Sequence, residues 1–190
     1  MDRRERALLR SRGLAALALA VALVAAVDLA WSQALTPAQQ QRMEQARSRE
    51  AEAKALLAKY TGTPGREDSD GLLKEPAVQA ELKRLVGNQL PKLMQNINVR
   101  GTIAFDGGSL VISGNSPHKG GEEEGVVCVS PHAPGLVEAG LYSRGKITVF
   151  GTAAKCEYLS LCVKDWITQA NSGHRDRFAQ PKNVVFGKPN

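Results

Sequence analysis

The middle of the chain, residues 97–150, consists of short apolar segments that alternate with polar residues and are separated by tight-turn signals. Alternation with a period of two is typical of strands, and glycine-containing pairs between strands are typical of hairpins. The turn signals are Asp106-Gly107-Gly108, Arg144-Gly145 and a Pro-rich stretch at residues 131–135. Five consecutive strands joined in this way predict an antiparallel meander, which limits the folds open to the chain.

Two amphipathic segments flank the predicted sheet. Apolar residues recur at helical spacing in residues 72–86, and residues 161–167 are similarly patterned. We expect both helices to cover the same face of the sheet, with residues 90–94 forming a turn after the first of them. The fold class is therefore predicted as α+β, a two-layer domain over residues 72–170 in which helices back a five-stranded antiparallel meander.

The first 34 residues have the pattern of a secretory signal peptide. Five arginines precede an uncharged run at residues 13–27, and small residues surround Gln33. The uncharged run is shorter than the roughly 20 residues that a membrane-spanning helix needs. Cleavage after Ala34 is expected, and it predicts a periplasmic or secreted protein without a membrane span. An uncleaved signal anchor is the alternative.

The remaining segments are accessories of the predicted domain. Residues 35–60 are rich in Gln and Ala, open with a Thr-Pro helix start, and predict a spacer or a helix that docks at one end only. Residues 61–71 are rich in Gly, Pro and acidic residues and predict a linker. Residues 171–190 are polar and basic and predict a flexible tail, although residues 184–186 could add an edge strand.

The charge of the chain allows nucleic acid as a partner, but its pattern argues against it. The formal net charge of +6 becomes +4 without residues 1–34, which hold five Arg against three acidic residues. Acidic runs at residues 67–68 and 122–124 interrupt any basic stripe, and export separates the protein from most nucleic acid. We therefore expect no nucleic-acid partner.

Three cysteines in an exported chain are most simply explained by one disulfide and one free thiol. Cys156 and Cys162 lie six residues apart, which a loop or a helix start could close, and we predict the disulfide between them. Cys128 alternates with valines in a predicted strand, where a free cysteine behaves as a small buried apolar residue. The alternative is that all three are free and buried.

The chain contains none of the common catalytic motifs, so an enzyme is not expected. Metal binding would require His118, His132 and a carboxylate of residues 122–124, but their spacing matches no compact metal site. We expect neither a metal nor a cofactor. His132 in a Pro-rich turn and His174 in the predicted tail are interpreted as exposed residues without a function.

Residues 113–124 form the loop between two predicted strands. Pro117 restricts the backbone just before His118, and Gly114, Gly120 and Gly121 permit the turns that bring the chain back. The pattern predicts a rigid hairpin tip that projects one imidazole. From these residues alone, an ordinary surface loop is an equally good interpretation.

Four stretches of the chain also occur together in a known family. These are L-x-x-L-V-G-x-x-L-P at residues 82–91, a strand leading into Pro117-His118, E-E-G-V-V-C-V at residues 123–129, and L-Y-S-R-G-K-I-T-V-F at residues 141–150. Together they resemble the Ivy family of periplasmic inhibitors of vertebrate lysozyme, over about residues 72–170. The fold of that family, an antiparallel sheet backed by helices, agrees with the fold predicted above.

The resemblance implies a target-binding loop. In the Ivy family a C-x-P-H-x-C loop inserts its histidine into the lysozyme cleft, against the two catalytic carboxylates. The motif's Pro and His fall on Pro117 and His118, while its two cysteines correspond to Asn115 and Gly120, so this chain is a divergent member that lacks the loop disulfide. The implied loop comprises Asn115, Ser116, Pro117, His118, Lys119 and Gly120.

Two functions follow as hypotheses. The first is a non-enzymatic inhibitor that binds a lysozyme, or one of the cell's own lytic transglycosylases, through this loop. The second is a structural or assembly component of the cell envelope, in which the helix at residues 35–60 lies along a partner or forms a homodimer.

Overall fold

The structure, a computed structural model, describes residues 35–62, 65–131, 135–171 and 181–187. The predicted signal peptide, its cleavage site, His132 and His174 lie outside these residues. Residues 45–190 are the second of two units, and this second unit contains the sheet, the helices from residue 69 onward and the C-terminal part of the helix at residues 37–60.

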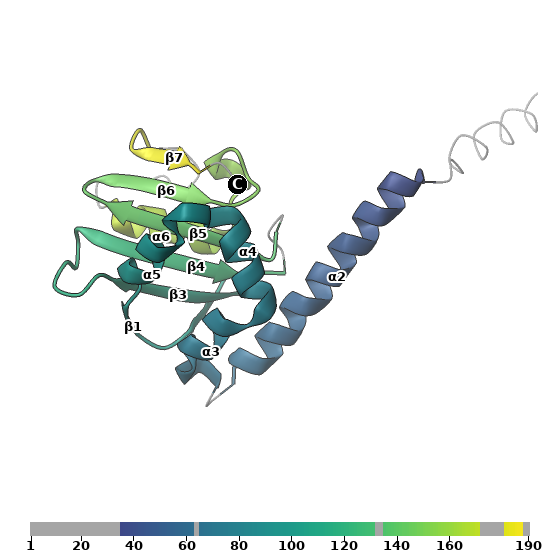
Figure 1. Cartoon of the computed structure of the whole chain (residues 1–190), viewed down its shortest axis with the longest axis horizontal. Coiled ribbons are helices and arrows are strands. Elements are labelled where there is room, and N and C mark those ends of the chain that lie inside the picture. Colours follow the sequence, from purple (N-terminus) through teal and green to yellow (C-terminus); the bar gives the residue numbers. More distant parts are fainter. Residues whose placement is uncertain (1–34, 63–64, 132–134, 172–180, 188–190) are drawn as a thin grey trace, which may run out of the picture. The chain divides into compact units, whose positions relative to one another are not determined.

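The core of the second unit is a seven-stranded sheet of order β1-β3-β4-β5-β6-β7, with β2 also paired to β3 (Figure 1). All pairs are antiparallel except β6 with β7, so the α+β class and the antiparallel meander are confirmed. The strands are β1 (Val99–Arg100), β2 (Ala104–Asp106), β3 (Ser109–Asn115), β4 (Glu123–Val129), β5 (Val137–Ser143), β6 (Lys146–Phe150) and β7 (Val184–Phe186). The sheet has two strands more than predicted. One arises because the first predicted strand is divided. The other is β7, which confirms the alternative that residues 184–186 of the predicted tail add an edge strand.

The first predicted strand is divided into β1 and β2 because Ile103 pairs outside the sheet. Its N–H donates to the carbonyl of Arg66 at 2.7 Å, and its own carbonyl accepts from Arg66 Nε at 3.1 Å. Arg66 lies in the short 3-10 helix Gly65–Glu67, within the segment predicted as a linker. Part of that segment is therefore fastened to the connection between β1 and β2.

Both short hairpins form as predicted. Gly107 and Gly108 (φ 55° and 78°) join β2 to β3, and Arg144 and Gly145 (φ 50° and 79°) join β5 to β6. Two consecutive residues with positive φ are the signature of a type I′ turn, whose twist matches that of the flanking strands.

The helices differ from the prediction in their boundaries. They are α2 (Pro37–Tyr60), α3 (Ser69–Lys74), α4 (Pro76–Val86), α5 (Leu90–Asn96) and α6 (Leu161–Ala170). The predicted helix at residues 72–86 is broken before Pro76, because a proline disfavours helical backbone at the residue before it, and Glu75 has ψ 130°. The predicted turn at residues 90–94 is helix α5, which Pro91 begins rather than ends, since proline suits the first turn of a helix.

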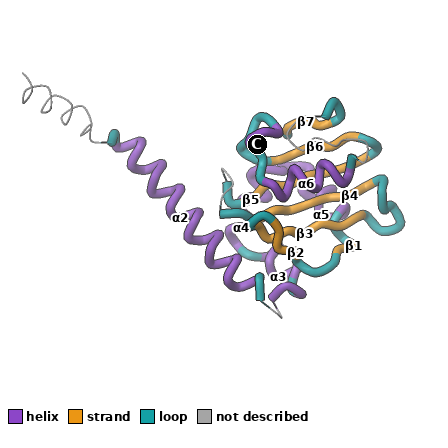
Figure 2. Tube along the Cα trace, turned by 180° about the vertical axis from the view of Figure 1, so that it is seen from behind, coloured by secondary structure: helices purple, strands orange, loops and turns teal. Residues whose placement is uncertain are grey.

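The two predicted covering helices lie on opposite faces of the sheet, so the two-layer prediction was wrong. Helices α3, α4 and α5 pack on one face, together with Ala53, Leu56 and Tyr60 of α2, while α6 packs on the other (Figures 1 and 2). A Cβ added to Gly140 of β5 would lie 2.3 Å from the Trp166 ring, which shows how closely α6 approaches the strands. The domain therefore has three layers, with the sheet in the middle.

The predicted Cys156–Cys162 disulfide is also wrong. Cys128 of β4 is bonded to Cys162 of α6, with 6.3 Å between their Cα atoms, and Cys156 is a free, buried thiol. Cys128 shares its face of the sheet with Val126 and points toward α6, so the bond ties the third layer to the central strand. Proximity in sequence was therefore a poor guide to the pairing.

Reduction of this disulfide should destabilise the protein strongly. In the chain-entropy treatment, closing a loop of this length contributes about 4 kcal/mol to the free energy of unfolding. We expect Cys128→Ser to lose roughly that amount in urea unfolding, whereas Cys156→Ser, the matched substitution of a buried thiol, should retain the bond. Mapping disulfide-linked peptides by mass spectrometry checks the pairing directly, and a Cys156–Cys162 peptide in the native protein would contradict it.

Glu138 of β5 is a carboxylate buried between the sheet and α6, with only 1% of the residue exposed. Its Oε2 accepts a hydrogen bond from the Ser160 N–H at 2.8 Å, while its Oε1 has no hydrogen-bond partner. Burial raises the pKa of Glu138, and the Ser160 hydrogen bonds and the charge of Lys164 oppose this only in part. Folding therefore favours the protonated form of Glu138 more than the unfolded chain does.

Because its pKa is raised by folding, Glu138 contributes most to stability at pH values below the usual carboxyl pKa. This contribution is lost as the pH rises through the pKa of Glu138 in the folded state. We expect Glu138→Gln to be more stable than the wild type at pH 7.5 and to match it near pH 4, since glutamine mimics the neutral acid. Urea unfolding at both pH values measures this. Glu52→Gln, on the exposed part of α2, is the control, and an equal Glu138→Gln effect at both pH values would contradict the assignment.

Candidate target-binding loop

The predicted loop is the connection between β3 and β4, residues 116–122. The antiparallel ladder continues to Asn115 opposite Glu124, and the Ser116 N–H donates to the Glu123 carbonyl at 2.9 Å to close the loop's base. Ser116 is buried, whereas residues 117–122 are all exposed. In Figure 1 this connection extends past the left ends of the neighbouring strands.

His118 occupies the outer corner of a tight turn. The Lys119 N–H donates to the Ser116 carbonyl at 3.0 Å, so residues 116–119 form a β-turn with Pro117 and His118 at its centre. Proline at the first central position, followed by a positive φ of 60° at His118, is the pattern of a type II turn. Left-handed backbone is uncommon for a residue with a side chain and costs on the order of 1 kcal/mol. The turn thus presents the imidazole at a specific place on an exposed tip.

The base of the loop is held by a buried carboxylate that the sequence did not distinguish from its neighbours. Glu123 is 5% exposed, and its two oxygens lie 2.5 Å from Lys92 Nζ and 3.3 Å from Lys119 Nζ. The hydrogen bond from Lys92, followed by that from Lys119, lowers the pKa of Glu123. One ion-pair network therefore joins the loop, through Lys119, to helix α5, which carries Lys92.

Helix α5 is itself fixed beneath this end of the sheet. Asn96, fully buried at its C-terminus, donates to the carbonyl of Glu124 at 3.1 Å and to that of Tyr142 at 2.9 Å. Gly125 permits the close packing, because a Cβ there would lie 2.8 Å from Ile97 Cγ2. Helix α5, which supports the base of the loop, is therefore itself bonded to both β4 and β5.

Asn115 and Gly120 lie side by side across the base of the loop. The Asn115 side-chain amide donates to the Ser116 carbonyl at 2.9 Å, and a Cβ added to Gly120 would lie 3.7 Å from Asn115 Nδ2 and 3.9 Å from its Cγ. The six predicted loop residues are thus contiguous in space as well as in sequence. Neither position that corresponds to a cysteine of the family motif carries a thiol, since Asn115 has a side-chain amide and Gly120 has no side chain.

The turn between β5 and β6 adjoins the loop. The Arg144 N–H donates to the carbonyl of Glu122 at 3.1 Å, and Glu123 pairs with Ser143 in the β4–β5 ladder. The sequence predicts Arg144-Gly145 as a hairpin turn but does not predict its contact with the loop, because that contact depends on the order of the strands in the sheet.

Within residues 35–62, 65–131, 135–171 and 181–187, no group of three His, Cys, Asp or Glu side chains is arranged to hold a metal ion. His132, the second histidine of the metal site weighed above, is outside those ranges. Across the same residues no helix has the length and apolar character needed to cross a membrane.

Comparison with known proteins adds one match. A family described as Inhibitor of vertebrate lysozyme (Ivy) matches residues 77–173, just over half of the 190 residues. No curated protein and no solved structure matches the chain. The matched segment begins in α4 and runs past the end of α6, so it includes the β3–β4 hairpin, the ion-paired base of the loop and the disulfide. The chain belongs to the Ivy family of lysozyme inhibitors.

Proposed function

We propose that this protein acts in the periplasm, or after secretion, as an inhibitor that inserts Pro117 and His118 into the cleft of a peptidoglycan-cleaving glycosidase. The observation that carries the proposal is the left-handed backbone of His118 on the exposed corner of a β-turn with an anchored base. The target is a lysozyme or a lytic transglycosylase, and the protein is not itself an enzyme.

The chemistry of such a cleft suits an imidazole. Most glycosidases place two carboxyl groups about 5–9.5 Å apart on either side of the bond that they cleave. A protonated imidazole has two N–H donors on opposite sides of a small ring, so it can donate one hydrogen bond to each carboxylate. Hydrogen bonds between ionised partners are the strongest that proteins make. An inserted His118 would satisfy both carboxylates and exclude the sugar.

Affinity depends on how much order the loop must gain on binding. The family motif restrains its loop with a disulfide. Here the corresponding restraint is the two backbone hydrogen bonds at Ser116 together with the Glu123 ion pairs to Lys92 and Lys119. Restraints present before binding reduce the entropy lost in the complex. Because its pKa is lowered, Glu123 keeps its charge, and so its ion pairs, until the pH falls below the usual carboxyl range.

His118 should carry most of the inhibition. We expect His118→Asn to weaken inhibition at least 100-fold, the range expected when about 3 kcal/mol of charge-assisted hydrogen bonding is lost. Asparagine tolerates left-handed backbone, so the turn should persist. The measurement is the rate at which a vertebrate lysozyme, and separately a lytic transglycosylase, clears a peptidoglycan suspension in the presence of each variant.

Lys83→Gln is the control for His118→Asn, since it changes an exposed side chain on α4 rather than on the loop. Unchanged inhibition by a folded His118→Asn variant would refute the insertion of His118. If, in addition, a chain lacking residues 35–60 lost its cellular role, the assembly function of α2 would replace the inhibitory one.

Restoring the family's cysteines should strengthen inhibition. A Cβ built on Gly120 would lie 3.9 Å from the Cγ of Asn115, and a cysteine at position 115 would carry its sulfur at about the place of that Cγ. Small adjustments of the backbone would therefore allow a disulfide. We expect Asn115→Cys with Gly120→Cys to lower the inhibition constant severalfold when oxidised, and reduction to reverse the gain. Each single substitution is a control. A bridge that forms without any gain would show that the loop is already fully ordered.

A further inference from the structure

The two non-glycine residues with positive φ in the described part of the chain lie on adjacent tips of the sheet. They are His118, with φ 60°, and Arg144, with φ 50°. The Arg144 N–H is bonded to the carbonyl of Glu122, at the C-terminal end of the loop that carries His118. Backbone strain that the surrounding structure maintains is a reason to look for a function of the side chain at that position.

The other tight hairpin of the sheet makes the comparison sharper. Its type I′ turn uses Gly107 and Gly108, which adopt positive φ without strain, whereas the β5–β6 turn has an arginine at the corresponding first position. Asparagine, aspartate or glycine would stabilise that position, so a long cation there is unfavourable for the fold alone. The loss of stability is understandable if the Arg144 side chain is used in binding.

The charge of this end of the sheet agrees with such a use. Lys92 and Lys119 are engaged by Glu123, but among the described residues no ion pair or hydrogen bond involves the side chains of Arg144 or Lys146. Both residues are exposed, as is Glu122 in the loop. This end of the sheet therefore has two exposed cations, Arg144 and Lys146, that are unpaired among the described residues. It also has one exposed carboxylate, Glu122, that a partner must accommodate.

The two tips are also separated by a suitable distance. The β3–β4 loop and the β5–β6 turn are displaced by two strand positions at the same end of the sheet. Since neighbouring strands lie about 4.8 Å apart, the tips are roughly 10 Å apart, and they appear together at the left ends of the strands in Figure 1. A partner that holds His118 in its cleft would thus meet Arg144 at the rim of that cleft.

We propose that Arg144 is a second contact residue of the target-binding surface, and that it pairs with a carboxylate on the rim of the partner's cleft. This inference rests on the proposed inhibitory function, which it makes more specific. Lys146 supports Arg144 by adding a second unpaired cation to the same tip. The favoured target is consequently a glycosidase whose cleft has an acidic rim in addition to its catalytic carboxyl groups.

Arg144→Asn tests the proposal, because asparagine suits the left-handed backbone and removes only the cation. We expect the inhibition constant for the enzyme that the wild type inhibits to rise roughly tenfold or more, the range for loss of a hydrogen bond to a charged group. Arg144→Lys should recover part of that loss. The difference between wild type and Arg144→Asn should shrink as salt is raised from about 0.02 to 0.3 M, since salt screens exposed charges.

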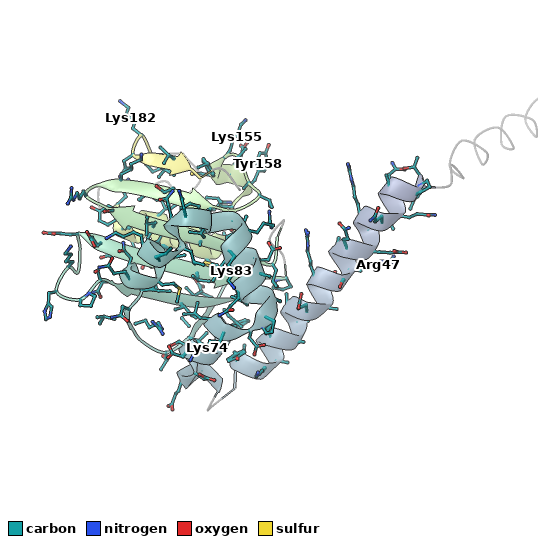
Figure 3. All side chains as sticks on the ribbon, in the orientation of Figure 1. Arg47, Lys74, Lys83, Lys155, Tyr158 and Lys182 are labelled. Carbon is teal, nitrogen blue, oxygen red and sulfur yellow. A yellow bond between two sulfur atoms is a disulfide. The ribbon has the colours of Figure 1, made fainter. Side chains whose placement is uncertain are left out.

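Lys83→Gln provides the matched control, as it also removes one exposed cation but lies on α4 (Figure 3). It should change inhibition less than twofold, and thermal unfolding should show that both variants are folded. An Arg144→Asn variant that inhibits as well as Lys83→Gln, while His118→Asn does not inhibit, would overturn this inference and leave the loop mechanism intact. A wild type that inhibits neither a vertebrate lysozyme nor a lytic transglycosylase would overturn both.

Discussion

The burial of β4 on both faces is the constraint from which the rest of the structure follows. Val127 and Val129 pack beneath the helices of one layer, while Val126 and Cys128 face α6 in the other. A strand in the middle of a sheet can be buried in this way only if both faces are covered. The order of strands, the position of α6 and the direction in which the β3–β4 loop leaves the sheet all depend on this strand.

The same strand connects the core to the candidate site. Glu123, the first residue of β4, is on the face that carries Gly125 and Val127, because alternate residues of a strand share a face. Its carboxylate is therefore directed toward α5 and meets Lys92 there, while the exposed residues of the loop end one position earlier, at Glu122. Packing of the core and restraint of the loop are thus parts of one arrangement, and a change in the register of β4 would alter both.

Short-range signals in the sequence were enough to predict much of this structure. The two glycine-containing turns, the hairpin that carries Pro117 and His118, and the docking of one end of α2 each depend on residues close together in the chain. Contacts between distant residues were not predicted: the Cys128–Cys162 bond spans 34 residues, and the Lys92–Glu123 pair spans 31. The unbroken apolar run at residues 126–129 is typical of a strand covered on both faces, and it is the feature of the sequence that indicates the third layer.

The disulfide between layers also affects how the protein acquires its fold in an oxidising compartment. Three cysteines allow three single bridges, and the bridge between Cys156 and Cys162 would close a loop of six residues rather than 34. Loop-closure entropy favours the shorter bridge in the unfolded chain by about 1.5 kcal/mol. Oxidation before folding therefore traps Cys162 with the wrong partner. The native bond then requires thiol exchange, in which the free Cys128 thiolate attacks the sulfur of Cys162 and releases Cys156. Correct oxidative folding therefore depends on an environment that permits disulfide isomerisation.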